Sequence, residues 1–226
     1  GSYNVAVGRN ALNNLAGGHR NTAIGYGSMY HFNETGGTKN TAIGMYAFYK
    51  PETGSNNVAL GYQAGYGETG VDGDGNTYLG ASAGYEHSGT NNNTAVGYQA
   101  MYGTNGAFTG DENVSMGVSS MLDVTSGQRN AVLGYQALRS GTTASYNTIL
   151  GYKAGFTTTT SEENTYIGYL AGYTNNANYN VFIGNGAGEM ATGVQKSVVV
   201  GRQAMGAAAA TGDDNTIIGY RAGYDL

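Results

Sequence analysis

The stretch Asn93-Thr94-Ala95-Val96-Gly97-Tyr98-Gln99-Ala100 recurs along the whole chain, for example as Asn21-Thr22-Ala23-Ile24-Gly25-Tyr26-Gly27-Ser28. The motif occurs 13 times, at spacings of 16 to 20 residues and most often 17. We number positions from its glycine, with −1 before it and +1 after it. The reference glycines are Gly8, Gly25, Gly44, Gly61, Gly80, Gly97, Gly117, Gly134, Gly151, Gly168, Gly184, Gly201 and Gly219. A short fixed period is typical of a solenoid, in which stacked repeats share one core.

Three positions of the motif are nearly invariant. Position −4 is Asn in 12 of 13 copies, with Ser197 as the exception, and position −1 is always Ile, Val, Leu or Met. Position +3 is Ala in 11 copies and Ser in two. We therefore predict a single all-β domain over residues 1–226, a parallel β-solenoid (β-roll or β-helix) of 13 coils with about 17 residues each. At one strand spacing of about 4.8 Å per coil, the rod would be roughly 60 Å long.

The strand at the centre of the motif is apolar on both faces. Positions −3 and −1 share one face because they lie two residues apart, and we expect this face to point into the coil. Position −2 should then point outward, yet it is uncharged in all 13 copies. An uncharged outward column predicts packing against another copy of the chain, as a homo-oligomer with a trimer favoured. On this interpretation Ile149→Asp should disrupt assembly, and Thr158→Asp in a loop should be silent.

The Asn and Gly columns are the candidate structural ladder. Asn side chains satisfy turn backbone and tolerate left-handed conformations, so we expect each amide to bond the next coil or its own turn. The glycine should mark a bend where a Cβ would collide, and the small residue at +3 should let a second short strand approach. The ladder residues singled out are Asn21, Asn40, Asn57, Asn93, Asn130, Asn147, Gly25, Gly44, Gly61, Gly97, Gly134 and Gly151.

The motif N-T-A-I-G-x-x-A resembles the head repeats of trimeric autotransporter adhesins (YadA-like heads), and its longer Tyr-rich form is similar to repeats of phage tail fibres. The similarity covers the chain from Asn4 to Tyr224. It implies a trimeric fibre or head in which three parallel β-rolls pack around a threefold axis. The family repeat is shorter than the 17 residues found here, so the shape of the coil can differ.

Tyrosines form two columns. One follows the glycine directly and provides the candidate surface aromatic contacts Tyr26, Tyr62, Tyr98, Tyr135, Tyr152, Tyr169 and Tyr220. The other stands at +5 and includes Tyr30, Tyr49, Tyr66, Tyr85, Tyr102, Tyr173 and Tyr224. Aligned coils should stack both columns into aromatic ladders, suited to packing, inter-chain contact or sugar binding.

Composition excludes several function classes. The net charge of −5 is spread thinly, so we do not expect nucleic-acid binding. No apolar run is long enough to cross a membrane, so we do not expect membrane insertion. There is no cysteine, so disulfides and thiolate metal sites are excluded. The three histidines occupy different loops, and the acidic pairs Asp111-Glu112, Glu162-Glu163 and Asp213-Asp214 read as turns, with surface calcium as the alternative. The run Asp72–Asn76 begins like a calcium loop but has Thr77 where that loop needs glycine. We predict no enzyme, catalytic residue, metal or cofactor.

Three functions remain open. The favoured one is an extracellular, cell-surface or virion fibre or head that displays loops to a glycan or protein receptor; the alternative is a self-assembling extracellular filament. Ice binding is the minor alternative, disfavoured because the Thr column at −3 should point inward. Recognition is expected in the long insertions His31 to Lys39, Glu68 to Gly75 and Thr104 to Glu112, because loops can vary at little cost in stability.

Overall fold

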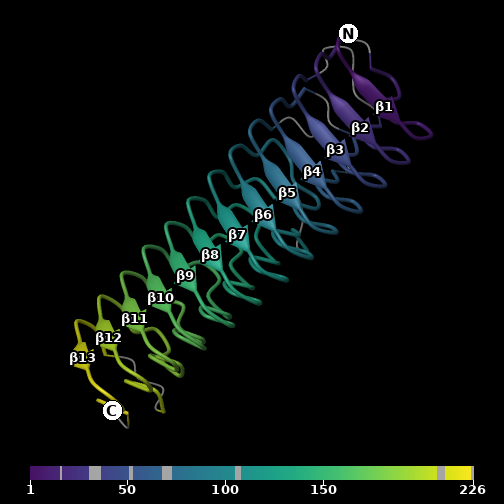
Figure 1. Ribbon diagram of the computed structural model, residues 1–226. Coiled ribbons are helices and arrows are strands. Elements are labelled where there is room, and N and C mark those ends of the chain that lie inside the picture. Colours follow the sequence, from purple (N-terminus) through teal and green to yellow (C-terminus); the bar gives the residue numbers. More distant parts are fainter. Residues whose placement is uncertain are drawn as a thin grey trace.

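The chain forms one straight stack of coils, with its termini at opposite ends of a rod (Figure 1). The computed structural model describes residues 1–15, 17–30, 37–50, 53–67, 73–104, 108–207 and 212–224. Each coil contributes one three-residue strand, and the strands pair in parallel, in chain order, as one 13-stranded sheet. The strands are β1 Val5–Val7, β2 Thr22–Ile24, β3 Thr41–Ile43, β4 Val58–Leu60, β5 Thr77–Leu79, β6 Thr94–Val96, β7 Val114–Met116, β8 Ala131–Leu133, β9 Thr148–Leu150, β10 Thr165–Ile167, β11 Val181–Ile183, β12 Val198–Val200 and β13 Thr216–Ile218.

The register is uniform from coil to coil. Thr22 pairs with Thr41 and Ile149 with Tyr166, so equal motif positions lie side by side along the rod. The β-solenoid predicted from the repeat is therefore confirmed. The described residues at +3 lie in turns, and the expected second short strand is not formed there.

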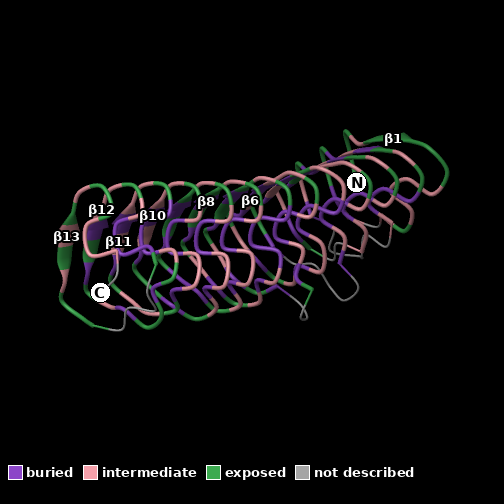
Figure 2. Ribbon diagram, turned by 90° about the horizontal axis from the view of Figure 1, so that it is seen from below, coloured by how far each residue is buried: buried purple, intermediate pink, exposed green. Residues whose placement is uncertain are grey.

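The inner face of the sheet is the opposite of the one expected. Position −2 is buried in the 11 coils between the first and the last: Ala23, Ala95 and Tyr166 are fully buried and Ile149 is 1% exposed, all within the interior of their own coils. Positions −3 and −1 face outward, so the prediction that position −2 packs on another copy was wrong. The proposed control was wrong as well, because Thr158 is buried and its Oγ1 donates to the carbonyl of Asn175 at 2.8 Å. Buried residues recur at corresponding places in successive coils along the rod (Figure 2).

The interior is filled by pairs of residues at −2 and +4 whose sizes compensate. Where −2 is small, +4 is usually large, as in Ala23/Met29, Ala42/Phe48, Ala95/Met101 and Ser115/Met121. Ala59/Gly65 is an exception, where the rings of Phe48 and Tyr78 from the neighbouring coils reach the space beside Gly65. Where −2 is large, +4 is glycine, as in Tyr78/Gly84, Ile149/Gly155, Tyr166/Gly172 and Phe182/Gly188. A Cβ on Gly84 would lie 2.3 Å from Cδ1 of Tyr78, which shows how closely the ring fills the space. The cross-section of the coil is thus constant although its residues differ, as close packing requires.

The asparagine ladder predicted at −4 is present and buried. The backbone N–H of Asn93 donates to Oδ1 of Asn76 at 2.9 Å, and Nδ2 of Asn93 donates to the carbonyl of Gly110 in the following coil at 2.9 Å. The same pattern joins Asn130 to Asn113 and to Ala144. Each such asparagine therefore connects three successive coils, through its backbone N–H and its side-chain amide, and satisfies buried backbone groups that the short strands leave unpaired.

The bend after each strand depends on the glycine. Gly134 has a φ of +146°, and a Cβ on it would lie 2.1 Å from the carbonyl oxygen of Gly151 in the next coil. In the turn that follows, every second residue has a left-handed backbone conformation: Gln99 at +2 and Met101 at +4 both have positive φ. Their N–H groups bond carbonyls of Ala81 and Ser120, one coil back and one coil forward. These inter-coil bonds hold strained left-handed residues in place without a second strand.

Candidate functional site: the outer face of the sheet and the tyrosine columns

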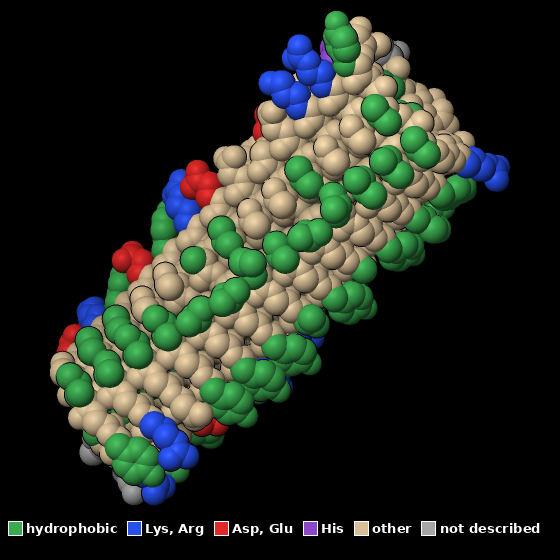
Figure 3. Space-filling view, viewed as in Figure 1, with side chains coloured by type: hydrophobic (Ala, Val, Ile, Leu, Met, Phe, Trp, Pro, Cys, Tyr) green, Lys and Arg blue, Asp and Glu red, His purple; other side chains and the backbone are tan. Residues whose placement is uncertain are grey.

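The outer face of the sheet is a continuous, uncharged strip. It consists of positions −3 and −1, which are Thr, Val or Ala and Ile, Val, Leu or Met in every coil. Ile24, Leu79 and Leu150 are 36, 45 and 42% exposed there, values unusual for large aliphatic side chains repeated in one line. Rows of hydrophobic side chains follow the axis of the rod, with charged groups near its margins (Figure 3).

The threonine column belongs to this outer face. Thr148 and Thr216 are exposed, and Thr22, Thr41, Thr77, Thr94 and Thr165 are half-buried beside them. The expectation that these threonines point inward was wrong, for the same reason that position −2 was misplaced: a three-residue strand is apolar on both faces. The objection to ice binding that rested on their orientation is therefore removed.

The tyrosine column at +1 adjoins the strip across the glycine bend. Tyr135, Tyr152 and Tyr169 stack with centroids 5.3 and 5.2 Å apart and are 42–49% exposed. Tyr62 and Tyr98 stand apart from this stack, since the +1 residues around them are Met45, Ala81 and Val118, and they are 49 and 53% exposed. Tyr26 contacts Tyr46 edge-on, and the ring of Tyr220 lies beneath Arg202.

The +5 column forms the longest aromatic ladder. Tyr30, Tyr49, Tyr66, Tyr85 and Tyr102 are stacked with centroids 4.7 to 5.5 Å apart. Each such pair contributes about 0.5–1.5 kcal/mol beyond its buried area. Stacked rings cover one another's faces, so the inner members offer edges and hydroxyls to a ligand. The expected +5 ladder is thus observed over five coils, whereas the +1 column stacks through Tyr135, Tyr152 and Tyr169 and is interrupted elsewhere by residues that are not aromatic.

A small hollow of about 150 Å³ lies between the two columns, lined by Asn10, Tyr26, Gly27, Tyr30, Tyr46 and Tyr49. Tyr26 and Tyr46 share a hydrogen bond there, and this contact is the main reason that the pKa of Tyr46 is raised. Two further tyrosines, Tyr78 and Tyr166, are interior residues whose pKa is raised by burial.

His19 and His87 lie in different coils. His87 is buried against Tyr78, with its Nδ1 2.9 Å from the carbonyl of Gly84, and burial lowers its pKa to about 4. His19 is exposed at the N-terminal end, and His31 lies outside the described residues. Glu112 pairs with Arg129 at 2.6 Å, and no group of three or more potential metal ligands occurs in the described part of the chain.

A second polar ladder at position −6 was missed by sequence reasoning. Asp111 accepts the backbone N–H of Asn91 at 2.7 Å, Asn91 accepts that of Asp74 at 3.0 Å, and Asp213 accepts that of Gln195 at 3.2 Å. Asp111 and Asp213 of the acidic pairs are therefore ladder acceptors. The column varies among Ser, Asp, Asn, Gln, Glu, Thr and His, so only its constant acceptor character could have revealed it.

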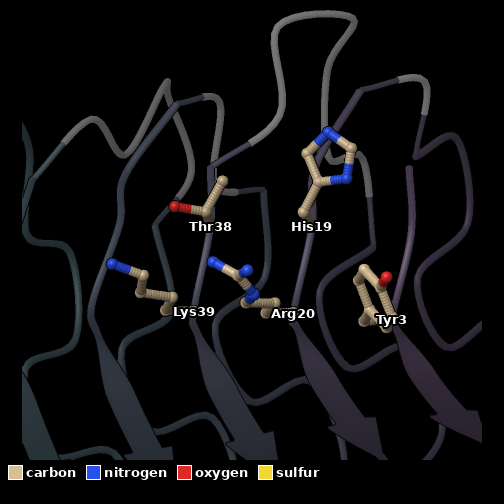
Figure 4. Close-up of a pocket in the computed structure, with 5 residues that line it drawn as sticks. All are labelled: Tyr3, His19, Arg20, Thr38 and Lys39. Atoms are coloured by element: carbon tan, nitrogen blue, oxygen red, sulfur yellow. The ribbon is translucent and has the colours of Figure 1, made fainter.

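A basic pocket at the N-terminal end was also missed. It is a hollow of about 410 Å³ lined by Tyr3, His19, Arg20, Thr38 and Lys39 (Figure 4). The insertions expected to carry recognition fall partly on residues 31–36, 68–72 and 105–107, which lie outside those the structure describes. Thr38 and Lys39 are the described end of the first insertion.

The fold and these surfaces define the chain as a parallel β-solenoid repeat protein with an exposed apolar sheet face. No family model, curated protein or solved structure matches the chain. Within the described part there is no apolar helix of bilayer-spanning length.

Proposed function

We propose that the chain is a non-catalytic structural module of an extracellular fibre or adhesin head, assembled as a homotrimer, which presents its edges and loops to a surface receptor. The observation that carries this proposal is the uncharged outer face of the sheet. Thirteen strands lie about 4.8 Å apart, and each three-residue strand is about 10 Å long, so the flat area of the face is about 600 Å². That is the upper end of the range of about 300–600 Å² that the largest apolar patch of a typical monomer covers, and it approaches the roughly 800 Å² that each partner contributes to a specific interface.

Two adjoining strips favour a trimer over a twofold dimer. The outer sheet face and the +1 tyrosine column meet at the glycine bend, so each chain presents two different surfaces to its surroundings. A twofold dimer needs one self-complementary patch, whereas a closed ring uses two different patches in heterologous contacts. The sequence resemblance to trimeric adhesin heads agrees with this arrangement.

The test is the mass of the assembled protein by light scattering. A trimer gives about 70 kDa, three times the 23.3 kDa chain. Leu150→Asp places a carboxylate on the outer face and should reduce the mass to that of single chains without unfolding the coil, because Leu150 is 42% exposed within its own rod. Thr143→Asp is the matched control, since Thr143 is exposed in a bend outside the strands.

A wild-type chain that is monodisperse at 23 kDa would exclude the trimer. Negative-stain images separate the closed trimer from the filament alternative, because a trimer gives rods of about 60 Å and a filament gives lengths that grow with concentration.

Ice binding is the second candidate, supported by the outward Thr column of the sheet. Large aliphatic side chains at −1 alternate with it and interrupt a purely threonine surface. Thermal hysteresis of the purified protein decides between the two: activity that is lost in Thr94→Tyr and retained in Thr143→Tyr would favour ice binding over the fibre.

A further inference from the structure

The basic pocket at the N-terminal end is built from two neighbouring columns. Tyr3, Arg20 and Lys39 occupy position −5 of the first three coils, and His19 and Thr38 occupy position −6. Because Val5 pairs with Thr22 and Thr22 with Thr41, the three −5 residues lie side by side on adjacent coils. Figure 4 shows their side chains on the segments that lead into the first strands.

The pocket concentrates positive charge in a protein whose net charge is −5. Elsewhere in the −5 column, Arg129 stands between Glu112 and Tyr146, and Lys196 between Tyr179 and Asp214. Arg20 and Lys39 are instead direct neighbours, and among the described residues neither has a carboxylate within 4.0 Å. Like charges held side by side repel each other, so a bound anion would relieve this repulsion.

Two of the lining residues are anchored by hydrogen bonds. His19 accepts the backbone N–H of Ser2 through Nδ1 at 2.9 Å, so its neutral ring carries the proton on Nε2 and can donate it. Thr38 is anchored by its own N–H, which donates to Oγ of Ser55 at 3.0 Å. A planar guanidinium matches the two oxygens of a carboxylate or sulfate, and the ammonium of Lys39 adds a point charge.

The size and walls of the pocket indicate more than a bare ion. Its volume of about 410 Å³ is within the range of small-molecule sites and well above that of an inorganic oxyanion. The ring of Tyr3, 82% exposed, supplies an apolar face of the kind on which a sugar ring can pack, and Thr38 supplies a hydroxyl partner.

We propose that this pocket binds an acidic saccharide through its carboxylate or sulfate group, with Arg20 and Lys39 holding the anion and Tyr3 contacting the sugar. This deepens the proposed attachment function and rests on it for its biological meaning. The binding itself depends only on the pocket and can be measured without a host cell.

The experiment is calorimetric titration of the assembled wild-type protein at low and high salt with four probes: glucuronic acid, N-acetylglucosamine 6-sulfate, neutral N-acetylglucosamine and inorganic sulfate. We expect the two acidic sugars to bind about tenfold more tightly than the neutral sugar and to weaken in high salt. Arg20→Gln and Lys39→Gln should each weaken acidic-sugar binding about tenfold. Lys196→Gln, in the same column near the C-terminal end, is the matched control and should leave it unchanged.

Three results would overturn the proposal: equal binding of acidic and neutral sugars, full binding by an Arg20→Gln/Lys39→Gln double variant, or inorganic sulfate binding as tightly as the sulfated sugar. All five lining residues are at the surface, so unchanged melting of the variants separates loss of binding from loss of fold.

Cell attachment distinguishes this proposal from the proposed function. If the wild type attaches and the double variant attaches equally well, the pocket is not the receptor site although the attachment function stands. If neither attaches but acidic sugars bind the wild type alone, the pocket stands and the attachment function fails.

Discussion

Removal of one ladder amide, by Asn130→Ala, should destabilise the contact between its coil and the following one. Asn130 is 2% exposed, and its Oδ1 accepts the backbone N–H of Asn147 at 3.0 Å while its Nδ2 donates to the carbonyl of Ala144 at 2.7 Å. Alanine leaves both of these buried backbone groups without a partner. At about 1–3 kcal/mol for each unsatisfied group, the cost is about 2–6 kcal/mol per chain.

Two variants in the same column calibrate this value. Ser197 is the one natural exception at −4, and its Oγ still accepts the N–H of Asn215 at 3.0 Å. Asn130→Ser should therefore keep the acceptor for Asn147 and cost about half as much as alanine. Asn215→Ala is the control, because Asn215 is half-buried and water can replace its bonds, so the loss should be below about 1 kcal/mol.

The assay combines thermal unfolding, followed by circular dichroism, with amide hydrogen exchange. Solenoids unfold locally as well as globally, so exchange at Asn147 reports the affected coil directly. A loss of 2 kcal/mol or more accelerates exchange by about thirtyfold or more. Equal effects of Asn130→Ala and Asn215→Ala, or an unchanged melting temperature for Asn130→Ala, would show that the ladder does not stabilise the coils as argued.

Two further predictions concern the interior of the rod. Gly84→Met alone should abolish folding of its coil because the ring of Tyr78 occupies the space. The double variant Tyr78→Ala/Gly84→Met reproduces the Ala95/Met101 pair and should recover most of the stability, measured by denaturant unfolding. A double variant no more stable than the single one would refute size compensation. Burial lowers the pKa of His87 from its ordinary 6.5 to about 4, so the unfolded chain binds a proton more readily, and stability present above pH 6.5 should fall as the pH drops toward 4, by at most about 3 kcal/mol. His87→Phe should remove that slope from the pH dependence of unfolding, and an unchanged slope would assign it to other groups.

The sequence by itself determined the repeat, the number of coils and the columns. Equal motif positions must lie side by side in a solenoid of nearly constant period, so the asparagine ladder, the glycine bend and the +5 tyrosine stack could be predicted from the sequence alone. The basic pocket and the −6 ladder could not, because neighbouring coils contribute different residue types there. Their chemistry emerges only when Arg20 is placed beside Lys39 and Asp111 beside Asn91.

Only the tertiary structure decided which face of the strand points inward. Alternation distinguishes the faces of a strand when one is polar, but in Thr94-Ala95-Val96 both faces are apolar or small. The larger aliphatic residues were expected inside because burial favours them. The interior is too narrow for that arrangement, because Met101 at +4 already fills the space opposite Ala95, as the ring of Tyr78 fills the space beside Gly84. Packing volume therefore outweighed hydrophobicity and left the larger side chains on the outer face.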